Sequence, residues 1–389
     1  MIWPIYHTLV IVLLIAAIAM MFANFRVFRR LRTATTAEKS PFVSVLVPAR
    51  NEEVRIHACV GSLLAQDYAN YELLVLDDRS EDATPQILDN IGLRENGKKH
   101  RRIHGEELPP GWIGKNWACH QLAQNARGEF LLFTDADTIH KPGALQAVVA
   151  HALDTRADLL SAWPQQLTGT WSEKVVIPII HLAGLALFPH PLIPWLQSDP
   201  VRAQKLPQGF LHALGIANGQ VIFFRRSAYD AIGGHAAVRD HLVEDVALGR
   251  AMTRRIGEGM RLVNCDGSEL IDCRMYRSFR ELWEGFTKNA WPAFEGAHGL
   301  WWATGITHLC IFFLPFVLVF FPSQRMVALT EIALIYFIRF VLTLRTRTSW
   351  LGCWLHPLGH GIAMLIALNS QRLASRKGVT WKGRTYRAE

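Results

Sequence analysis

The sequence predicts an α/β protein built on an open, mostly parallel sheet, with hydrophobic helices at both ends of the chain. Three observations predict this class. Apolar runs of strand length alternate with segments of helical spacing between residues 41 and 165. Long apolar segments lie before residue 26 and after residue 300. Half of the 389 residues are hydrophobic and only 19% are charged, which excludes a disordered or fibrous protein and argues against a purely soluble one.

The N-terminal segment Ile2–Phe25 is predicted to be a transmembrane anchor, because about 20 helical residues span a bilayer. Four arginines between positions 26 and 32 follow this apolar run. A secretory signal peptide has its charges before the run and a cleavage site after it. Since basic flanks remain in the cytoplasm, we expect residues 1–30 to anchor a domain that faces the cytoplasm.

The predicted strands and helices alternate at the start of this domain, which we expect to cover residues 41–290. The first strand is a β-branched run, and the later strands are short and apolar. The helices show apolar residues at helical spacing, with Ser80 or Asp82 as a cap and Pro142 in a first turn. The strands cover residues 42–47, 71–76, 129–134 and 158–162. The helices cover residues 53–66, 82–96, 115–127 and 142–154.

Acidic residues follow three of these strands, and open parallel sheets bind ligands at the carboxyl ends of their strands. The acidic segments are Pro48-Ala49-Arg50-Asn51-Glu52-Glu53, then Asp77-Asp78, then Asp135-Ala136-Asp137. For a single loop, turn formation and helix capping explain such residues best, but that explanation is weaker for three loops together. The sequence contains neither GxGxxG after a strand nor GxxxxGK[ST], which counts against a dinucleotide site and a P-loop.

Asp135 and Asp137 are candidate metal ligands. Residues i and i+2 of an extended segment point the same way, and Ala136 leaves room between them. Paired carboxylates bind Mg²⁺ or Mn²⁺, which can bridge a diphosphate and neutralise its charge as it leaves. About a hundred residues later, Glu244 and Asp245 open a predicted helix. These acids either complement the helix dipole or supply a general base, and the sequence alone leaves both readings open.

The apolar region Val175–Leu196 contains four prolines, which interrupt a regular helix. A single membrane crossing here would place the acidic motifs on opposite sides of the membrane. We therefore expect residues 171–196 to form an interfacial segment or a lid on the bilayer surface.

Three hydrophobic stretches are expected to form C-terminal membrane helices within residues 300–370. The segment 322–325 joins the first two, which predicts a hairpin of membrane helices. The third is the least lipid-like and is expected to be re-entrant or interfacial. A basic tail, residues 371–389, follows it. If all three stretches cross, this tail ends outside, contrary to the positive-inside rule, so its side stays open. The stretches are Trp301–Phe321, Met326–Leu344 and Trp350–Asn369.

Several other side chains are interpreted as structural. The six cysteines form no CxxC pair, so buried roles are expected for Cys119 and Cys265 rather than that of a nucleophile. His356 and His360 could share a helix face as metal ligands, but helix packing or headgroup contact is the expected role without a third ligand. The net charge of +8 lies largely beside membrane segments, and no nucleic-acid partner is expected because no reader motif is present.

Together these motifs resemble the family 2 glycosyltransferases of the GT-A fold, a Rossmann-like sheet. The resemblance covers about residues 41–289 and includes the connecting segments Lys115–Glu129 and Gly219–Arg226. The motifs that carry it are residues 45–53, Asp77-Asp78-Arg79-Ser80, Asp135-Ala136-Asp137 and Glu244-Asp245. A weaker resemblance, to carotenoid-acid and hopanoid-associated glycosyltransferases, rests on residues 108–115, 274–278 and 381–386.

The resemblance implies roles for individual residues. Asp245, with Glu244 beside it, would be the base for an inverting attack at the anomeric carbon. Asp137, with Asp135, would bind the metal. Lys115 would either reach the diphosphate or remain a solvated charge. The nucleotide-sugar site would contain Pro48, Ala49, Glu52, Asp77, Asp78, Lys115 and Asp135.

The sequence departs from the pattern of processive polysaccharide synthases, which carry a QxxRW motif after the acidic pair. The corresponding region, residues 274–283, has no glutamine in place, which favours single transfers. Arg277, Arg280 and Trp283 remain candidates for a loop that closes over donor or acceptor.

The resemblance thus implies a metal-dependent inverting enzyme that moves a sugar from a nucleotide sugar, expected to be UDP-linked, to a carotenoid-like or hopanoid-like membrane lipid. Mg²⁺ or Mn²⁺ is the expected cofactor. We expect a multi-pass protein of the bacterial cytoplasmic membrane with its catalytic domain in the cytoplasm. The alternatives are a polyprenyl-phosphate-directed or polysaccharide synthase of the same family and, from another class, an inactive membrane scaffold.

Overall fold

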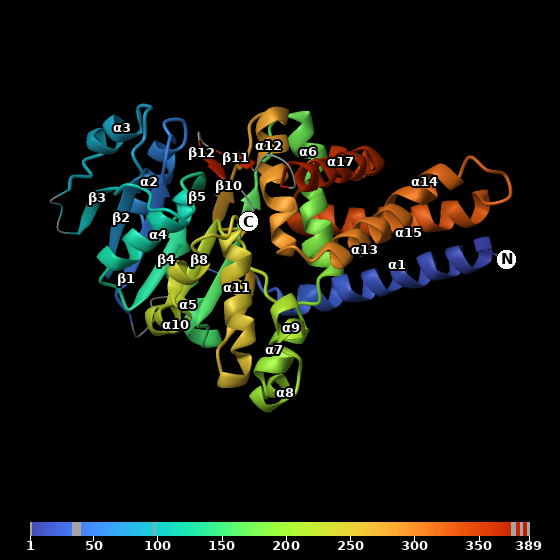
Figure 1. Cartoon of the computed structure of the whole chain (residues 1–389), viewed down its shortest axis with the longest axis horizontal. Helices are drawn as coiled ribbons and strands as arrows, with labels where there is room; N and C mark the ends of the chain where they lie inside the picture. The colour runs from blue at the N-terminus through green and yellow to red at the C-terminus, as the bar shows by residue number, and fades with distance from the viewer. Residues whose placement is uncertain are drawn as a thin grey trace. The chain divides into compact units, whose positions relative to one another are not determined.

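The computed structural model describes residues 2–32, 40–95, 97, 99–374, 379–381 and 384–386, and within them the chain divides into two compact units (Figure 1). The α/β unit comprises Phe28–Gln165 and His190–Arg274. The helical unit comprises the described residues of Met1–Val27, Gln166–Pro189 and Met275–Glu389. This division differs from the single domain that we expected over residues 41–290, because residues 166–189 and 275–290 group with the hydrophobic helices.

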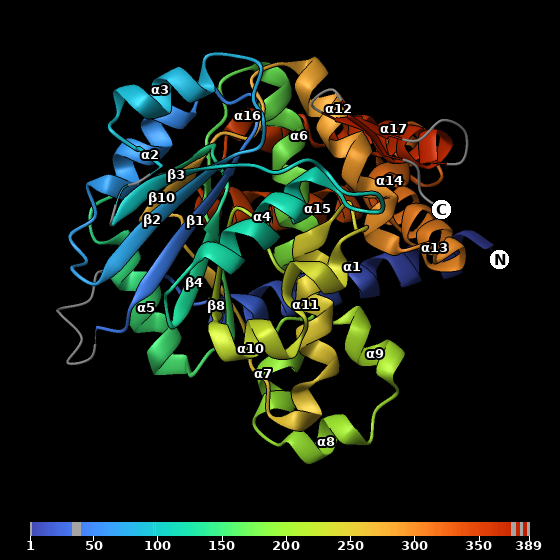
Figure 2. The ribbon, with the colours of Figure 1, turned by 60° about the vertical axis from the view of Figure 1, so that its left-hand side comes forward.

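Among the described residues, seven strands form the main sheet of the α/β unit in the order β3-β2-β1-β4-β8-β6-β9 (Figure 2). These strands are β1 (Val43–Ala49), β2 (Tyr71–Asp77), β3 (His100–His104), β4 (Phe130–Thr134), β6 (Leu159–Trp163), β8 (Val221–Arg225) and β9 (Leu262–Asp266). Neighbouring strands are parallel except that β8 is antiparallel to both β4 and β6. The prediction of a mostly parallel α/β sheet is therefore confirmed, and the four predicted strands are β1, β2, β4 and β6.

The helices after β1 and β2 begin later than predicted, because the acidic loops occupy the first residues after each strand. Helix α3 also ends early, at Asn90, since Gly92 two residues on has a φ of +90°, which favours glycine. The helices of this unit are α2 (Ile56–Leu64), α3 (Thr84–Asn90), α4 (Gly114–Asn125), α5 (Ala144–Thr155), α7 (Leu192–Gln197), α8 (Pro200–Gln204), α9 (Gln208–Ala213), α10 (Arg226–Ala231) and α11 (Glu244–Arg254). A second sheet, in the order β5-β10-β7, consists of β5 (Thr138–His140), β7 (Gln165–Gln166) and β10 (Ile271–Cys273).

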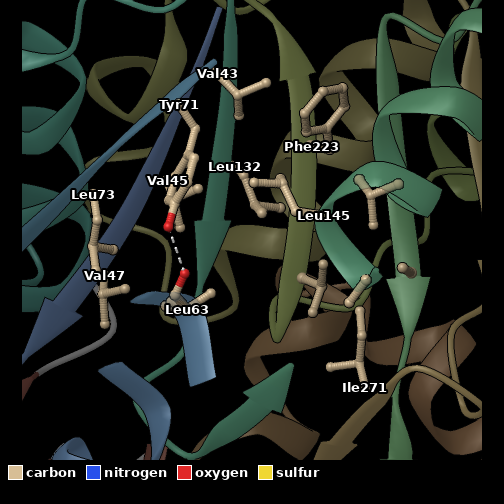
Figure 3. Close-up of a cluster of buried hydrophobic side chains, with 14 of the residues drawn as sticks. Val43, Val45, Val47, Leu63, Tyr71, Leu73, Leu132, Leu145, Phe223 and Ile271 are labelled. Carbon is tan, nitrogen blue, oxygen red and sulfur yellow. Dashed lines mark hydrogen bonds between the residues drawn. The ribbon is translucent and has the colours of Figure 1, made fainter. Parts of the chain in front are cut away.

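The main hydrophobic core lies between one face of the sheet and helices α2 and α5 (Figure 3). Leu63 of α2 and Leu145 of α5 are both about 1% exposed and belong to the same cluster as strand residues Val45 and Leu132. The hydroxyl of Tyr71 donates to the carbonyl of Leu63 over 3.0 Å, so the polar group at this edge of the core is paired. This packing fixes the strands whose ends carry the acidic residues.

In the helical unit, three of the described helical segments are long and apolar enough to span a membrane: Ile2–Val27, His298–Leu318 and Arg325–Thr346. They match the predicted spans that begin at residues 2, 301 and 326. The helices are α1 (Ile2–Val27), α6 (Trp171–His181) with the π-helical continuation η1 (Leu182–Leu187), α12 (Phe279–Ala290), α13 (His298–His308), the π-helix η5 (Leu309–Phe313), α14 (Leu314–Leu318), α15 (Arg325–Thr346), α16 (Trp350–Trp354) and α17 (His356–Ala374).

The third predicted stretch is divided between α16 and α17 and is not among those three segments. The hairpin of β11 (Val379–Trp381) and β12 (Arg384–Tyr386) belongs to the predicted basic tail. Four basic residues of that tail lie outside the described residues: Arg376, Lys377, Lys382 and Arg387.

The expected interfacial segment, residues 171–196, is divided between the two units at Pro189, and its place at the bilayer surface stays a prediction. Helix α6 belongs to the helical unit, where Val176 and Ile177 are buried in a cluster with Leu282 and Ile366. Helix α7 belongs to the α/β unit. An apolar helix with prolines has the same composition whether it lies on a membrane surface or packs inside a helical bundle. Composition therefore does not distinguish these two positions.

Candidate active site

The loops after β1 and β2 are bonded to each other at the carboxyl edge of the sheet. Ala49 ends β1 opposite Asp77 of β2, and the N–H of Asp78 donates to the carbonyl of Ala49 over 2.7 Å. The N–H of Glu52 donates to the hydroxyl of Thr84 over 2.8 Å. Asp77 and Asp78 are buried, at 3% and 4% exposed. These bonds hold the predicted nucleotide-binding residues of both loops in one fixed arrangement.

The Asp135-Ala136-Asp137 segment leaves β4 at the same edge. The N–H of Asp135 donates to the carbonyl of Gln220 over 3.2 Å, and the hydroxyl of Thr138 donates to the carbonyl of Asp135 over 2.8 Å. The Oδ1 atom of Asp137 is buried and has no hydrogen-bond partner within the described part of the chain. This segment is therefore tied by its backbone, and one of its carboxylate oxygens is left unsatisfied.

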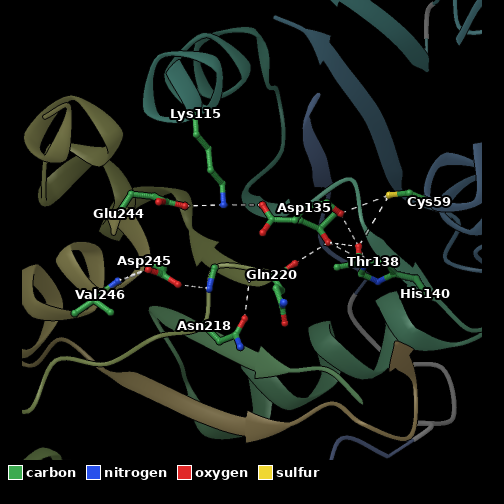
Figure 4. A network of polar contacts seen from close by, with 12 residues as sticks. Cys59, Lys115, Asp135, Thr138, His140, Asn218, Gln220, Glu244, Asp245 and Val246 are labelled. Carbon is green, nitrogen blue, oxygen red and sulfur yellow. Dashed lines mark hydrogen bonds and ion pairs between the residues drawn. The ribbon is translucent and has the colours of Figure 1, made fainter. Parts of the chain in front are cut away.

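Lys115 joins two of the predicted acidic motifs (Figure 4). It lies in the first turn of α4, and its Nζ is 2.6 Å from Oδ1 of Asp135 and 2.7 Å from Oε1 of Glu244. The Lys115 and Glu244 side chains are 34% and 11% exposed, so solvent screens this pairing only in part. Asp135 and Glu244, which are 109 positions apart in the sequence, thus contact the same ammonium group.

Asp245 is held by two backbone N–H groups. Its Oδ2 accepts from Gly219 over 2.7 Å, and its Oδ1 accepts from Val246 over 2.8 Å (Figure 4). A side chain at Gly219 would collide with this carboxylate, since a Cβ there would lie 2.9 Å from Oδ2. Each carboxylate oxygen has a second lone pair, so both can still accept a proton or another hydrogen bond.

A buried polar network lies beneath Asp135. The hydroxyl of Thr134 donates to the carbonyl of Gln220 over 2.9 Å and lies 3.0 Å from Nε2 of His140. Burial lowers the pKa of His140 to about 4, so its imidazole is neutral near pH 7. This network supports the Asp135 loop without adding charge to it.

The environment raises the pKa values of Asp137 and Asp245. Burial, and then the charges of Asp135 and Glu52, raise the pKa of Asp137 to about 6. Burial, and then Glu244, raise the pKa of Asp245 to about 6. Burial alone would lower the pKa of Lys115, but Asp135 and Glu244 raise it well above its ordinary value. Lys115 is therefore charged at neutral pH, and the acids around it repel one another.

The residues present fit a divalent metal ion, although no group of three or more His, Cys, Asp and Glu side chains is assembled for one among the described residues. Asp135 and Asp137 supply hard carboxylate oxygens, and the unpaired Oδ1 of Asp137 is an unused ligand atom. Phosphate oxygens and water commonly complete such a coordination sphere, since Mg²⁺ sites often have only one or two protein carboxylates.

The structure assembles most of the predicted site residues in the α/β unit. Pro48, Lys115, Asp135 and Glu244 line one small pocket, together with Gly219 and His235, which were assigned no role from the sequence. Glu52 lies beside it in the first loop, where Oε2 is 3.3 Å from the guanidinium of Arg55. A neutral glycine and a buried histidine give no local signal of their position beside acids far away in the sequence.

The other candidate residues from the sequence lie in the helical unit or are buried cysteines. Arg277, Arg280 and Trp283 belong to the helical unit, where Arg280 pairs with Glu284 over 2.8 Å. Cys119 and Cys265 are buried, and burial raises the pKa of each thiol, which argues against a thiolate nucleophile as expected.

Comparisons with known proteins agree with this fold. The sequence profile of Glycosyl transferase family 2 matches residues 44–190. The 4,4'-diaponeurosporenoate glycosyltransferase of Staphylococcus haemolyticus is 29% identical over 65% of this chain, and the matched part spans only 62% of that relative. The enzyme of the same name from Staphylococcus aureus strain N315 is 26% identical over 92% of this chain and 91% of its own length.

The same fold occurs in a mannosyltransferase from Pyrobaculum calidifontis, solved in complex with GDP-Man and Mn²⁺. That structure matches 94% of this chain and 98% of its own, with a TM-score of 0.53 and 16% identity, which supports the fold alone. With the family profile, the named relatives and the sheet topology in agreement, the chain is a glycosyltransferase of the GT-A fold that resembles family 2 over residues 44–190 and is similar to the diaponeurosporenoate glycosyltransferases.

Proposed function

We propose that this enzyme transfers a sugar from a nucleotide sugar, most simply a UDP-sugar, to a carboxylate-bearing membrane lipid, with Mg²⁺ or Mn²⁺ as cofactor and inversion at the anomeric carbon. One observation carries the proposal: at the carboxyl edge of the sheet, Nζ of Lys115 lies within 2.7 Å of carboxylate oxygens of both Asp135 and Glu244. Asp137 and Asp245 lie close enough to this group to be affected by its charges. The names of the relatives support an acidic carotenoid-like acceptor.

The donor would bind in the loops after β1 and β2. Pro48, Ala49 and Glu52 would line the nucleoside pocket, and the buried Asp77 and Asp78 would accept hydrogen bonds from uracil or ribose. Lys115 would bind the diphosphate, because it lines the pocket and its ammonium is charged.

A metal ion held by Asp135 and Asp137 would supply charge neutralisation on the leaving diphosphate. In the transfer itself, an acceptor oxygen forms a bond to the anomeric carbon from the face opposite the leaving group. The bond from that carbon to the diphosphate oxygen breaks, and its electron pair leaves with the nucleoside diphosphate. Lys115 stabilises the negative charge that develops there.

Asp245 has a role that depends on the acceptor. A hydroxyl acceptor must lose its proton, and Asp245 with a pKa of about 6 is ionised at neutral pH and can take it. A carboxylic acid acceptor is already ionised, so no proton is transferred and Asp245 only orients the attacking oxygen. The fixed position of Asp245 between Gly219 and Val246 suits either role.

The hydrophobic helices would anchor the enzyme to the membrane that holds its acceptor. An apolar acceptor stays in the bilayer, so the enzyme must bring its site to the membrane surface, and three candidate spans in the described chain support such anchoring. We place the α/β unit in the cytoplasm of a bacterial cell, at the inner membrane, because basic residues follow the first span.

The test is transfer by the purified full-length protein in detergent or lipid nanodiscs. UDP-glucose and other nucleotide sugars would be supplied with Mn²⁺ and either a long-chain apolar acid or a polyprenyl phosphate, and products would be identified by mass spectrometry. A sugar ester of the acid is the expected product. Transfer only to the polyprenyl phosphate would contradict the proposed acceptor.

Two variants and a control sharpen this test. Asp137→Asn and Asp245→Asn should each lose at least about a hundredfold in turnover. Asp158→Asn is the matched control, because Asp158 is 22% exposed, similar to Asp135 at 26%, but pairs with Arg225 at the opposite end of the sheet. Equal turnover in all four proteins, or none in any of them, would indicate an inactive scaffold.

A further inference from the structure

We infer that Lys115 is an internal counter-ion that competes with the metal for Asp135, so that metal binds well only when a nucleoside diphosphate draws the ammonium away. The inference rests on the proposed function, because it takes Asp135 as a metal ligand and a diphosphate as the donor group. Lys115 would thereby determine the order in which the nucleotide and the metal bind.

The geometry of Lys115 is that of a shared cation. Its Nζ is 2.6 Å from Asp135 and 2.7 Å from Glu244, which are short charge-assisted contacts. Glu244 opens α11 and Asp135 follows β4, so the ammonium holds two separate elements together. Lys115 contacts Oδ1 of Asp135, so one of the two carboxylate oxygens that could hold a metal is already paired with a cation.

Asp137 shows what happens to an acid in this site without such a partner. Its Oδ1 is buried without a hydrogen-bond partner among the described residues, and Asp135 and Glu52 add negative charge around it. A cation at Asp137 would therefore be attracted, but Lys115 already neutralises the neighbouring carboxylate. Two cations at Asp135 repel each other, so the ammonium and the metal weaken each other's binding.

A diphosphate resolves this competition. The pocket that Lys115 lines also contains the start of α4, whose first turn carries no side-chain cap in the described structure, and helix N-termini favour anions. The lysine stem has four rotatable carbons, so Nζ can turn from Asp135 to a phosphate while remaining near Glu244. The nucleotide thus frees Asp135, and nucleotide and metal increase each other's affinity.

The test measures Mn²⁺ binding directly by electron paramagnetic resonance, using full-length protein in detergent with and without UDP or GDP. Wild type should bind Mn²⁺ weakly alone and roughly tenfold more tightly with its nucleotide. Lys115→Met should bind Mn²⁺ roughly tenfold more tightly than wild type without nucleotide, and should gain no more than about twofold from nucleotide. Lys141→Met is the matched control, since Lys141 pairs with Asp272 over 3.0 Å outside the pocket, and it should behave as wild type.

The outcomes separate the inference from the proposed function. If Lys115→Met binds nucleotide-free Mn²⁺ no more tightly than wild type, the inference is overturned while the proposed function stands. If wild type binds no Mn²⁺ even with nucleotide, the proposed metal site fails and the inference fails with it. Lys115→Gln, which keeps a polar chain of similar length, repeats the measurement if circular dichroism shows that the methionine variant is unfolded.

Discussion

The backbone N–H of Gly219 donates to Oδ2 of Asp245 over 2.7 Å, and the carbonyl of the next residue, Gln220, accepts from the N–H of Asp135 over 3.2 Å. Two consecutive residues before β8 therefore fix both the acid that leaves β4 and the acid that opens α11. The antiparallel course of β8 beside β4 makes this possible, because the start of β8 lies next to the end of β4. The spacing of the two acidic motifs is thus set by backbone hydrogen bonds as well as by the Lys115 side chain.

Gly219→Ala should therefore reduce turnover strongly while leaving the fold intact. The added Cβ would lie 2.9 Å from Oδ2 and 3.1 Å from Cβ of Asp245, so the carboxylate must move. We expect a loss of roughly a hundredfold in kcat with little change in KM for the donor, as expected when a reacting group is displaced by about an ångström.

Gly61→Ala is the control for this variant, because no heavy atom lies within 4 Å of a Cβ at that helical glycine. It should retain full activity and gain slightly in stability. Wild-type kcat in Gly219→Ala would show that Asp245 does not depend on this contact.

The fold class and the acidic residues of the site could be predicted from the sequence. The residues that hold those acids in place could not. Strands β1, β2, β4 and β6 are apolar and buried on both faces, so their runs are visible in the sequence. Strand β3 reads His100-Arg101-Arg102-Ile103-His104, and an edge strand with half-exposed polar residues has no such signal.

The supports were not predictable for a different reason. Gly219 and Asn116 act through hydrogen bonds to residues 26 and more than 120 positions away, and local patterns carry no information on such pairs. The packing of α6 among other helices was not predicted, because burial among helices and burial in a membrane surface select the same apolar residues. The acids were found because a parallel sheet places the ends of successive strands at one edge.

Asp137→Asn should raise the stability of the metal-free protein at neutral pH. The folded pKa of Asp137 is about 6 against an ordinary value of 3.8, so the folded state binds its proton more tightly than the unfolded state does. That stabilisation is complete below about pH 4 and is lost as the pH rises through 6. The wild-type melting temperature, without metal, should fall across this range, and it should fall less in the variant.

The size of this effect follows from the pKa difference. Two pKa units correspond to at most about 3 kcal/mol, and partial exposure of Asp137 reduces this to roughly 1–2 kcal/mol, or a few degrees in melting temperature. Differential scanning fluorimetry from pH 4 to 8 measures it. With Mn²⁺ and UDP added, wild type should have the higher melting temperature of the two proteins. A variant that melts below wild type at pH 7.5 without metal would contradict the burial cost assigned to Asp137.

Asn116→Ala should disturb the segment that leads into α11. The Nδ2 group of fully buried Asn116 donates to the carbonyls of Val238 over 2.7 Å, Arg239 over 3.2 Å and His241 over 3.0 Å. Removing it takes one donor from each of these carbonyls, of which Arg239 still accepts from Ile113 over 2.7 Å and Val238 from His241 over 3.0 Å. We expect a cost of roughly 1–3 kcal/mol and a shift of Glu244 away from Lys115. We expect a lower melting temperature and a fall of about tenfold in kcat.

Gln124→Ala on the same helix separates this effect from a general loss of helix stability. The Gln124 amide is exposed and contacts only the His120 ring, at 3.0 Å, among the bonds that the structure gives it. Its melting temperature and kcat should match wild type. If Asn116→Ala keeps both wild-type values as well, the three carbonyls are satisfied by other groups and the proposed positioning role is wrong.

Arg339 in candidate span α15 gives a prediction for the helical unit. Its side chain is 1% exposed, and its two terminal nitrogens donate over 2.8 Å to the carbonyls of Pro178 on α6 and Gly352 on α16. A side chain at Gly352 would overlap the carbonyl of Lys174, so α6 and α16 are in close backbone contact beside this guanidinium. Arg339 thus joins three helices through one planar group.

Arg339→Met should therefore destabilise the helical unit, because it removes one donor from each of two carbonyls on neighbouring helices, although Pro178 still accepts from the N–H of Leu182. We expect a loss of roughly 2 kcal/mol or more, seen as a lower melting temperature in detergent. Arg325→Met is the control, since exposed Arg325 donates to a single carbonyl, that of Val319, at the start of the same helix. The melting temperature of Arg339→Lys should lie between those of Arg339→Met and Arg325→Met, because an ammonium keeps the charge but lacks the planar guanidinium that reaches both carbonyls. Equal melting temperatures for Arg339→Met and Arg325→Met would mean that α6, α15 and α16 are held together by packing alone.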